Sequence, residues 1–306
     1  MSCNGVRNFD VEKDVPDLSG KVCLVTGGNS GLGKQTVLDL AKHSPAEIIL
    51  TARSADKARS AIDEIQQFVP TARITFLQLD LNSLASVQQA AKTVLASNHK
   101  IDILILNAGI MCTPPGLTAD GYETQFGTNH LSHALLAKLL LPLLQAAPSP
   151  RVVVLSSDMQ SQAPSSGIEF ATLNTTQEKM STVQRYGQSK LANILFARAL
   201  AQQYPNLTVA SVHPGVFRTN LQTSMKENST LIRIAAKVAG GLMPDASKGT
   251  RNQLWAATAQ EVKSGEYYLP VGVGGKGSKA ARDDALAKKL WEWTEKECEK
   301  WMLEEN

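Results

Sequence analysis

The sequence is poor in cysteine, and its few cysteines follow no pattern. Four occur in 306 residues, without CxxC or other metal-like spacing: Cys3, Cys23, Cys112 and Cys298. This scatter argues against a disulfide framework and against a zinc site, so we expect no resident metal. Reduced thiols fit a reducing compartment, and we predict a cytoplasmic protein.

Long apolar runs are missing as well. Residues 1–20 mix charged and apolar side chains and lack the apolar segment of a signal peptide or anchor. The longest apolar stretch, Leu131 to Ala147, contains polar residues and a proline and is shorter than the roughly 20 residues that cross a bilayer. The ends of the sequence carry no common lipidation signal. We therefore expect no membrane span.

Neither sign of charge dominates. Lysine and arginine number 31 against 28 aspartates and glutamates, a formal net charge of +3, and aromatic residues make up 5%. This small excess argues against nucleic acid as a partner. Apolar residues make up 43% and charged residues 19%, enough to bury a large core. The composition favours a globular chain.

Short β-like runs alternate with longer helical patterns along the chain. Seven runs rich in Val, Ile and Leu predict strands at Lys21–Gly27, Glu47–Ala52, Arg73–Leu79, Ile101–Asn107, Arg151–Ser157, Leu207–His213 and Gly265–Leu269. Apolar residues at three- and four-residue spacing predict helices at Gly31–His43, Ala55–Phe68, Ser83–Ser97, Gly121–Ala146, Tyr186–Gln203, Ala246–Ala259 and Ala281–Met302. This alternation is typical of a doubly wound α/β fold. We predict a Rossmann-type, mostly parallel seven-stranded sheet with helices on both faces, forming one domain over 18–306 after a polar extension at 1–17.

A glycine-rich turn lies between the first predicted strand and the first long helix. It reads Thr26-Gly27-Gly28-Asn29-Ser30-Gly31-Leu32-Gly33, so its glycines have the spacing GxxxGxG and not GxGxxG. Glycine permits positive φ and lets backbone N–H groups approach a pyrophosphate at a helix N-terminus. Many such turns are only tight loops, but the strand before it and the helix after it favour dinucleotide binding.

Three motifs together resemble the short-chain dehydrogenase/reductase family: the turn at 26–33, Asn107-Ala108-Gly109, and Tyr186-Gly187-Gln188-Ser189-Lys190. The resemblance covers about residues 18–269. The stretch 189–196 and the turn 213–219 further resemble the retinol-dehydrogenase and WW-domain-oxidoreductase branch. Members of that branch often carry a membrane anchor or WW modules, and we find neither pattern in this sequence.

The resemblance implies a nicotinamide cofactor, and the end of the second strand favours NADP(H). An acid about 20 residues after the turn holds the ribose of NAD, whereas an arginine accommodates the 2′-phosphate of NADP. Here Arg53 follows Ala52, although Arg53 could also be a solvated residue at a strand end. Asp80 resembles the residue that bonds the adenine amino group, the alternative being a carboxylate near a helix N-cap. With Arg53 and Asp80, the resemblance implies cofactor contacts from Gly27, Asn29, Ser30, Gly31, Leu32, Gly33, Leu81, Asn107, Ala108, Gly109, Tyr186, Lys190, Pro214, Gly215, Val216 and Thr219.

A tyrosine and a lysine four residues apart on a predicted helix, Tyr186 and Lys190, share one face. A phenol has a reference pKa near 10, and a neighbouring ammonium favours its ionised form. Such a tyrosine can protonate the alkoxide that hydride transfer to a carbonyl leaves. The resemblance implies that Ser157, rather than its neighbour Ser156, steadies the substrate oxygen. It also implies that the backbone of Asn129 holds a water that joins Lys190 to solvent; alternatively, Asn129 kinks a long helix.

The remaining features concern the substrate side. The resemblance implies a substrate lid at about 216–244, whose apolar residues favour a lipophilic ketone, aldehyde or alcohol, unless the segment only packs on the core. Met111 and Cys112 are expected to line the same cleft. Relatives often pair through helices equivalent to 121–146 and 186–203, so the sequence permits a homodimer. The histidines are interpreted as packing residues: His130, His133 and His213.

These residues predict an NADP(H)-dependent oxidoreductase acting on a small molecule, with Tyr186 as general acid and base. The alternative is a non-redox isomerase or cyclase, or a cofactor-sensing protein. The tyrosine and lysine pair weighs against the sensor, which does not need it.

Overall fold

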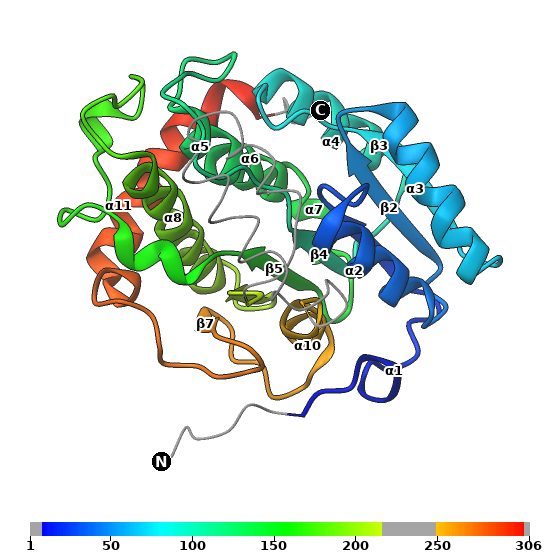
Figure 1. Cartoon of the computed structure of the whole chain (residues 1–306). Coiled ribbons are helices and arrows are strands. Elements are labelled where there is room, and N and C mark those ends of the chain that lie inside the picture. Colours follow the sequence, from blue (N-terminus) through cyan, green and yellow to red (C-terminus); the bar gives the residue numbers. More distant parts are fainter. Residues whose placement is uncertain (1–7, 216–248, 303–306) are drawn as a thin grey trace, which may run out of the picture.

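A computed structural model describes residues 8–215 and 249–302 of the chain (Figure 1). All seven predicted strands form one sheet in the order β3-β2-β1-β4-β5-β6-β7, and every neighbouring pair is parallel. The predicted α/β fold is thus confirmed, with a sheet that is entirely rather than mostly parallel. The strands are β1 (Val22–Val25), β2 (Glu47–Ala52), β3 (Ile74–Gln78), β4 (Ile103–Leu106), β5 (Arg151–Leu155), β6 (Thr208–Val212) and β7 (Glu266–Tyr268).

Helices cover both faces of this sheet (Figure 1). One face packs against α2 (Gly31–Ala41), α3 (Ala55–Phe68) and α10 (Arg251–Thr258). The other packs against α4 (Leu84–Ser97), α6 (Ser132–Leu139), α7 (Leu141–Gln145) and α8 (Thr182–Gln203). Because both faces are covered, the strands are nearly continuous apolar runs, as the sequence indicates.

The strand order reverses direction between β1 and β4. These neighbours pair in register from Cys23 with Ile103 to Val25 with Ile105. From β1 the chain winds outward through β2 and β3, and from β4 it winds the other way. By the general rule for open α/β sheets, the ligand crevice lies at the carboxyl edge between the loops that follow β1 and β4.

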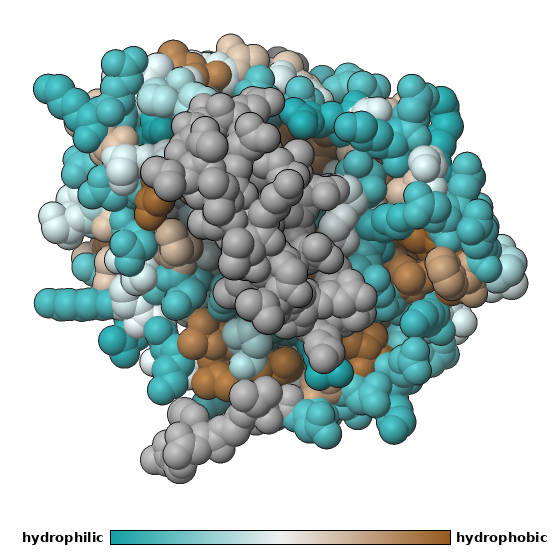
Figure 2. Space-filling view, viewed as in Figure 1, coloured by the Kyte–Doolittle hydropathy of each residue, from teal (hydrophilic) through white to brown (hydrophobic). Residues whose placement is uncertain are grey.

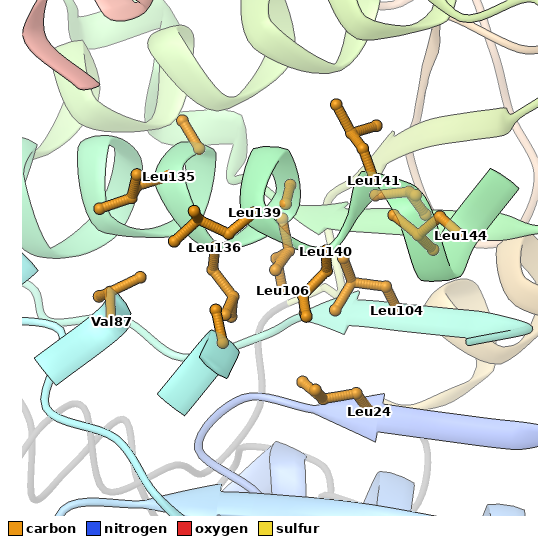
Figure 3. Close-up of a cluster of buried hydrophobic side chains, with 14 of the residues drawn as sticks. Leu24, Val87, Leu104, Leu106, Leu135, Leu136, Leu139, Leu140, Leu141 and Leu144 are labelled. Atoms are coloured by element: carbon orange, nitrogen blue, oxygen red, sulfur yellow. The ribbon is translucent and has the colours of Figure 1, made fainter. Parts of the chain in front are cut away.

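The largest apolar cluster lies between α6, α7 and the middle of the sheet (Figure 3). Figure 3 shows leucines of α6 and α7 packed over Leu104 and Leu106 of β4 and Leu24 of β1. Every residue of α6 is buried within the single chain. This packing holds α6 and α7 firmly against β4 and β1.

The single long helix predicted at Gly121–Ala146 is wrong. The structure divides it into α5 (Thr124–Phe126), a π-helical turn (Gly127–Leu131), α6 and α7. Pro142 stands in the first turn of α7, where its missing N–H costs nothing. Apolar spacing persists through all four pieces, so periodicity alone could not detect the breaks.

Helix α8, which carries Tyr186 and Lys190, begins earlier than predicted. Ser181 accepts a bond from the Gln184 backbone N–H, and the Gln184 side chain accepts one from the Ser181 backbone N–H. This capping box satisfies two otherwise unpaired donors and starts the helix at Thr182. Before it, residues 158–181 contain short 3₁₀ turns at Asp158–Gln162 and Phe170–Thr172.

Both ends of the described chain pack on the fold. The short helix α1 (Val11–Asp14) lies against α10, and Phe9, Val11 and Val15 are buried there, so this part of the N-terminal extension is less polar in its contacts than its composition indicates. At the other end, α11 (Asp284–Cys298) packs against α8, and a 3₁₀ turn (Glu299–Trp301) lies against α4, where the Gln88 amide donates to the Trp301 carbonyl at 2.8 Å.

Hydrophilic side chains cover most of the rim on the side shown in Figure 2. Large apolar side chains that are exposed include Phe68, Leu117 and Met302, which stand far apart in the sequence. Within residues 8–215 and 249–302, no helix combines the length and apolar character needed to cross a bilayer.

Candidate functional site

The glycine-rich turn packs tightly between β1 and α2. Gly27 and Gly31 have φ of +65° and +51°, which L side chains rarely adopt. A Cβ on Gly33 would stand 2.2 Å from the Gly27 carbonyl oxygen, so only glycine lets α2 approach the turn this closely. The glycines thus meet steric demands that are specific to this loop.

Thr26 joins the turn to the loop after β4. Its hydroxyl oxygen accepts bonds from the backbone N–H groups of Asn107 at 2.9 Å and Ala108 at 3.0 Å. The Asn107 side chain donates to the Thr26 carbonyl at 2.8 Å. These bonds fix the distance between the glycine-rich turn and the loop that follows β4.

The residues at the crevice fit a dinucleotide. The first N–H groups of an α-helix lack intrahelical partners, and Ser30 at the N-cap of α2 makes no side-chain capping bond, so these donors stay available to a ligand. Arg53 is exposed at the end of β2 and forms no ion pair with a described residue. Unpaired N–H groups and a free guanidinium are what phosphates bind.

Asp80 lies half-buried after β3. Its carboxylate accepts a bond from the Asn82 backbone N–H at 3.0 Å, whereas the N-cap of α4 is Ser83. Asp80 is thus a carboxylate near the N-cap of α4, as the alternative has it, while Ser83 is the N-cap itself. Leu81, next to it, is buried, and its carbonyl accepts the Ser132 hydroxyl.

Ser157, Tyr186 and Lys190 come together at the carboxyl edge of β5. Their side chains are almost completely buried, with 9%, 5% and 5% of their surfaces exposed. The Lys190 ammonium nitrogen lies 5.7 Å from the centre of the Tyr186 ring. The Ser157 hydroxyl lies close enough to the Tyr186 phenol to lower its pKa, although burial raises that pKa more. The i and i+4 spacing on α8 produces the predicted arrangement.

The electrostatics of the pair differ from the simplest expectation. Burial raises the pKa of Tyr186 to about 12, and the Ser157 hydroxyl opposes this rise. Burial also lowers the pKa of Lys190 to about 8. The ammonium at 5.7 Å therefore does not outweigh burial in the protein alone. Tyr186 stays protonated at neutral pH, which suits an acid.

Asn129 occupies the π-helical turn opposite Lys190. Its amide pairs with both backbone groups of Ile110, at 2.8 and 2.9 Å, and donates to the Ser189 hydroxyl at 3.0 Å. The Asn129 carbonyl accepts a bond from the His133 ring at 3.0 Å. The α-helical pattern changes to a π-helical turn at Asn129 without leaving helical backbone, and this turn places Asn129 beside Ser189 and Lys190.

The two neighbouring serines serve different partners. Ser156 donates to the Lys190 backbone carbonyl at 2.7 Å, and Ser157 faces Tyr186. Lys190 Nζ and the Asn193 amide both donate to the Leu155 carbonyl, at 3.2 and 2.9 Å. These bonds lock the middle of α8 to the end of β5.

The remaining predicted residues line the crevice or lie beyond the described chain. Gly109 stands so close to Lys190 that a Cβ there would be 3.4 Å from its nitrogen. Pro214 and Gly215 follow β6, and the Asn252 amide donates to the His213 carbonyl at 2.7 Å just before them. Val216, Thr219 and the predicted lid at 216–244 lie outside the described residues.

The sequence analysis interprets His133 as a packing residue and does not detect its hydrogen bond with Thr26. Since a carbonyl only accepts, His133 must donate through Nδ1 to Asn129, so its Nε2 accepts from Thr26 at 2.9 Å. Burial lowers the pKa of His133 to about 4 and keeps it neutral. His133 is thus a polar link and not only a packing residue. Its partner Thr26 stands in the glycine-rich motif, but no sequence spacing connects them.

Comparison with known proteins agrees with the geometry. Residues 21–230 match a family model described as short chain dehydrogenase. The short-chain dehydrogenase/reductase drtF of Aspergillus calidoustus is 43% identical over 309 residues, which cover 94% of this chain and 96% of that protein. Human retinol dehydrogenase 13 is 36% identical, with 90% and 83% covered. A solved structure of an uncharacterised protein from Mycobacterium paratuberculosis has a TM-score of 0.75 at 31% identity, with 94% and 97% covered.

Proposed function

Because the chain belongs to the short chain dehydrogenase family of oxidoreductases, we propose that it is an NADP(H)-dependent enzyme that interconverts a carbonyl and an alcohol on a lipophilic small molecule. The family uses nicotinamide cofactors and acts on small molecules. The observation that carries the proposal is the buried cluster of Ser157, Tyr186 and Lys190 beside the glycine-rich turn.

In this proposal each side chain has a separate task. A bound nicotinamide cofactor supplies the hydride to the carbonyl carbon, or accepts it in the reverse direction. The Tyr186 phenol gives its proton to the alkoxide oxygen as it forms, and its high pKa keeps that proton available at neutral pH. Ser157, within bonding reach of the same phenol, donates to the substrate oxygen and orients it. Asn129 holds the stretch that faces Lys190.

NADP(H) is favoured over NAD(H) by the end of β2. Ala52 is buried and is followed directly by the exposed Arg53 rather than by an acid, which supports a contact to the 2′-phosphate of NADP. Ser30 and the first N–H groups of α2 would hold the pyrophosphate. Lys190, beyond its effect on Tyr186, would bind the nicotinamide ribose.

We propose the cellular compartment of the protein from its thiols. Cys23 and Cys298 are buried and unpaired, and Cys112 is a free thiol as well. Such unpaired thiols support the cytoplasm, a reducing compartment.

The test is to incubate the protein and NADPH with a panel of lipophilic ketones and aldehydes while following the absorbance of the reduced nicotinamide. Tyr186→Phe removes one hydroxyl and keeps the ring, so turnover should fall by about 10²–10⁴ while NADPH affinity survives. Tyr204→Phe, the same change at the C-cap of α8 and therefore at the opposite end of the helix from Tyr186, should keep full activity. A Tyr186→Phe protein with wild-type turnover in a step limited by proton transfer would refute the assignment and favour an isomerase or cyclase.

A further inference from the structure

The stretch Ile110–Thr113, just after Asn107–Gly109, runs along the catalytic side chains. Ile110 is held by the Asn129 amide through both of its backbone groups. Cys112 lies near enough to Tyr186 for the charge of its thiolate to raise the pKa of the phenol. We call residues 110–113 the substrate-side wall, because they run beside α8 from near Lys190 to Thr182, the stretch that carries Tyr186.

The far end of this wall depends on side chains that arrive from α8 and α5. The Thr113 carbonyl accepts bonds from Arg185 at 3.0 Å and from the Thr182 hydroxyl at 2.8 Å. The Cys112 backbone N–H donates to Gln125 at 2.8 Å. Cys112 itself has φ of +54°, a conformation that a residue with a side chain keeps only when its surroundings impose it.

Arg185 is the residue on which these contacts converge. It is 1% exposed and stands immediately before Tyr186. Besides Thr113, it donates to the Thr176 carbonyl at 3.1 Å, and its Nε lies 3.6 Å from the carboxylate of Glu123, which is fully buried. Glu123 in turn accepts the Phe126 N–H and begins α5.

Stability alone does not explain the buried ion pair of Arg185 and Glu123. Removing two charges from water costs about as much as their attraction returns, so apolar residues of equal volume would hold the helices equally well. An apolar pair would not, however, hold the Thr113 carbonyl. The guanidinium of Arg185 connects the segments that carry Thr113, Thr176 and Glu123. The segment with Thr113 is the substrate-side wall.

We propose that Arg185, oriented by Glu123, is a positioning residue that holds the substrate-side wall against Tyr186 and so determines how the carbonyl substrate is seated. This inference rests on the proposed function for its kinetic part. Loss of the contact lets Cys112 and Thr113 withdraw from Tyr186. Cofactor binding does not change, because the glycine-rich turn and Arg53 make no contact with Arg185.

The first measurement is the rate at which a maleimide labels Cys112 in a Cys3→Ser background, where Cys23 and Cys298 are buried. Arg185 and Thr182 both lower the pKa of the Cys112 thiol, so losing either interaction alone raises that pKa and slows labelling at pH 7. Release of the wall exposes the thiol and speeds labelling. The sign of the change therefore separates the two effects.

The variants are Arg185→Met together with Glu123→Gln, which removes both buried charges, and Thr182→Val, which removes one bond to Thr113 and keeps the side-chain shape. Lys138→Met is the matched control, because Lys138 is also a buried cation, paired with Glu295 away from the site. We expect faster labelling in the first two proteins and an unchanged rate in the control.

The second measurement is steady-state kinetics with a carbonyl compound that the wild type reduces. We expect kcat/KM for that compound to fall by about 10- to 100-fold in the double variant, since a displacement of about 1 Å has effects of this size. The dissociation constant of NADPH should not change. Slowed or unchanged labelling in folded variants overturns the proposal, as does equal loss of affinity for NADPH. Faster labelling in a protein that reduces no carbonyl leaves the wall assignment standing and overturns only the proposed function.

Discussion

Lys190 carries a charge where the fold disfavours one. Its side chain is 5% exposed, and burial lowers its pKa from the ordinary 10.5 to about 8. Its nitrogen donates to the Leu155 carbonyl, and no carboxylate among the described residues offsets the burial. A residue kept at such a cost is typical of a functional site, where stability is given up for chemistry.

Replacing this lysine by an apolar residue of similar length should therefore stabilise the unliganded protein. Below pH 8 the folded state holds a buried charge that the unfolded chain solvates, and above the unfolded pKa of 10.5 both states are neutral. We expect Lys190→Met to raise the free energy of unfolding at pH 6–7 by about 1–3 kcal/mol, a gain that shrinks as pH rises above 8. Denaturant titrations at several pH values measure this. A variant less stable than wild type at pH 6 contradicts it.

Arg53 provides the second prediction at this scale. Loss of a charge-assisted contact to the 2′-phosphate should cost about 1.5–3 kcal/mol, or roughly 10- to 150-fold in kcat/KM, for NADPH alone. The measurement compares Arg53→Ala with both cofactors. Arg59→Ala is the control, because Arg59 is an exposed cation paired with Asp56 on the same helix. An equal loss with NADH would show that Arg53 does not select the cofactor.

Among the elements, the unit formed by β1, the glycine-rich turn and α2 is the one whose packing a single added carbon atom would disturb most. The turn can bring backbone N–H groups to a phosphate only if α2 starts directly against Gly27. Gly33 makes this possible, since an added Cβ would also stand 2.5 Å from the Asn107 amide. Thr26 then ties the unit to β4, so the geometry of the turn and of Asn107 is shared.

Gly33→Ala should therefore weaken NADPH binding strongly and destabilise the fold by about 1–3 kcal/mol, since the clash is with backbone that must shift. Fluorescence titration with NADPH and thermal unfolding measure the two effects. Gly275→Ala is the control: its φ is +74° but no atom lies within 4 Å of the added carbon, so stability should fall while affinity stays. Unaltered NADPH affinity in Gly33→Ala contradicts the assignment of the turn.

At the scale of the whole molecule, α11 covers surface of α6 and α8 that could otherwise form an interface with a second chain. Trp291 stacks on Phe196 of α8, with ring centres 5.9 Å apart, and Lys138 of α6 forms an ion pair with Glu295. Together with the sheet, these contacts bury all of α6 and nearly all of the first two thirds of α8. The apolar surface through which the sequence permits a homodimer is thus already used within one chain.

We accordingly expect no dimer through α6 and α8. Light scattering after size exclusion, at tens of micromolar protein, should give the mass of a single chain, because a stable interface needs roughly 1,200 Å² or more of complementary surface. A mass of two chains, with cross-links between α8 of one copy and α8 of the other, would contradict this. Pairing through another face would leave the packing of α11 unchanged.

The sequence by itself determined most of the architecture. Seven apolar runs separated by helical patterns predict the parallel sheet because strands buried on both faces must be apolar along their whole length. The glycine-rich turn and the i, i+4 pair of Tyr186 and Lys190 could also be found from sequence, since both are local: their geometry follows from neighbours within one turn or one helix.

Only the tertiary structure decided the contacts between distant segments. His133 and Thr26 are 107 residues apart, and the apolar spacing around His133 hides its polar role. No local pattern shows three further features: the π-helical turn at Asn129, the bond from Arg185 to Thr113, and the packing of α11 over α6 and α8. The pKa of Lys190 follows the same rule, because burial depends on everything that packs around the residue, and a spacing of four describes only the helix that carries it.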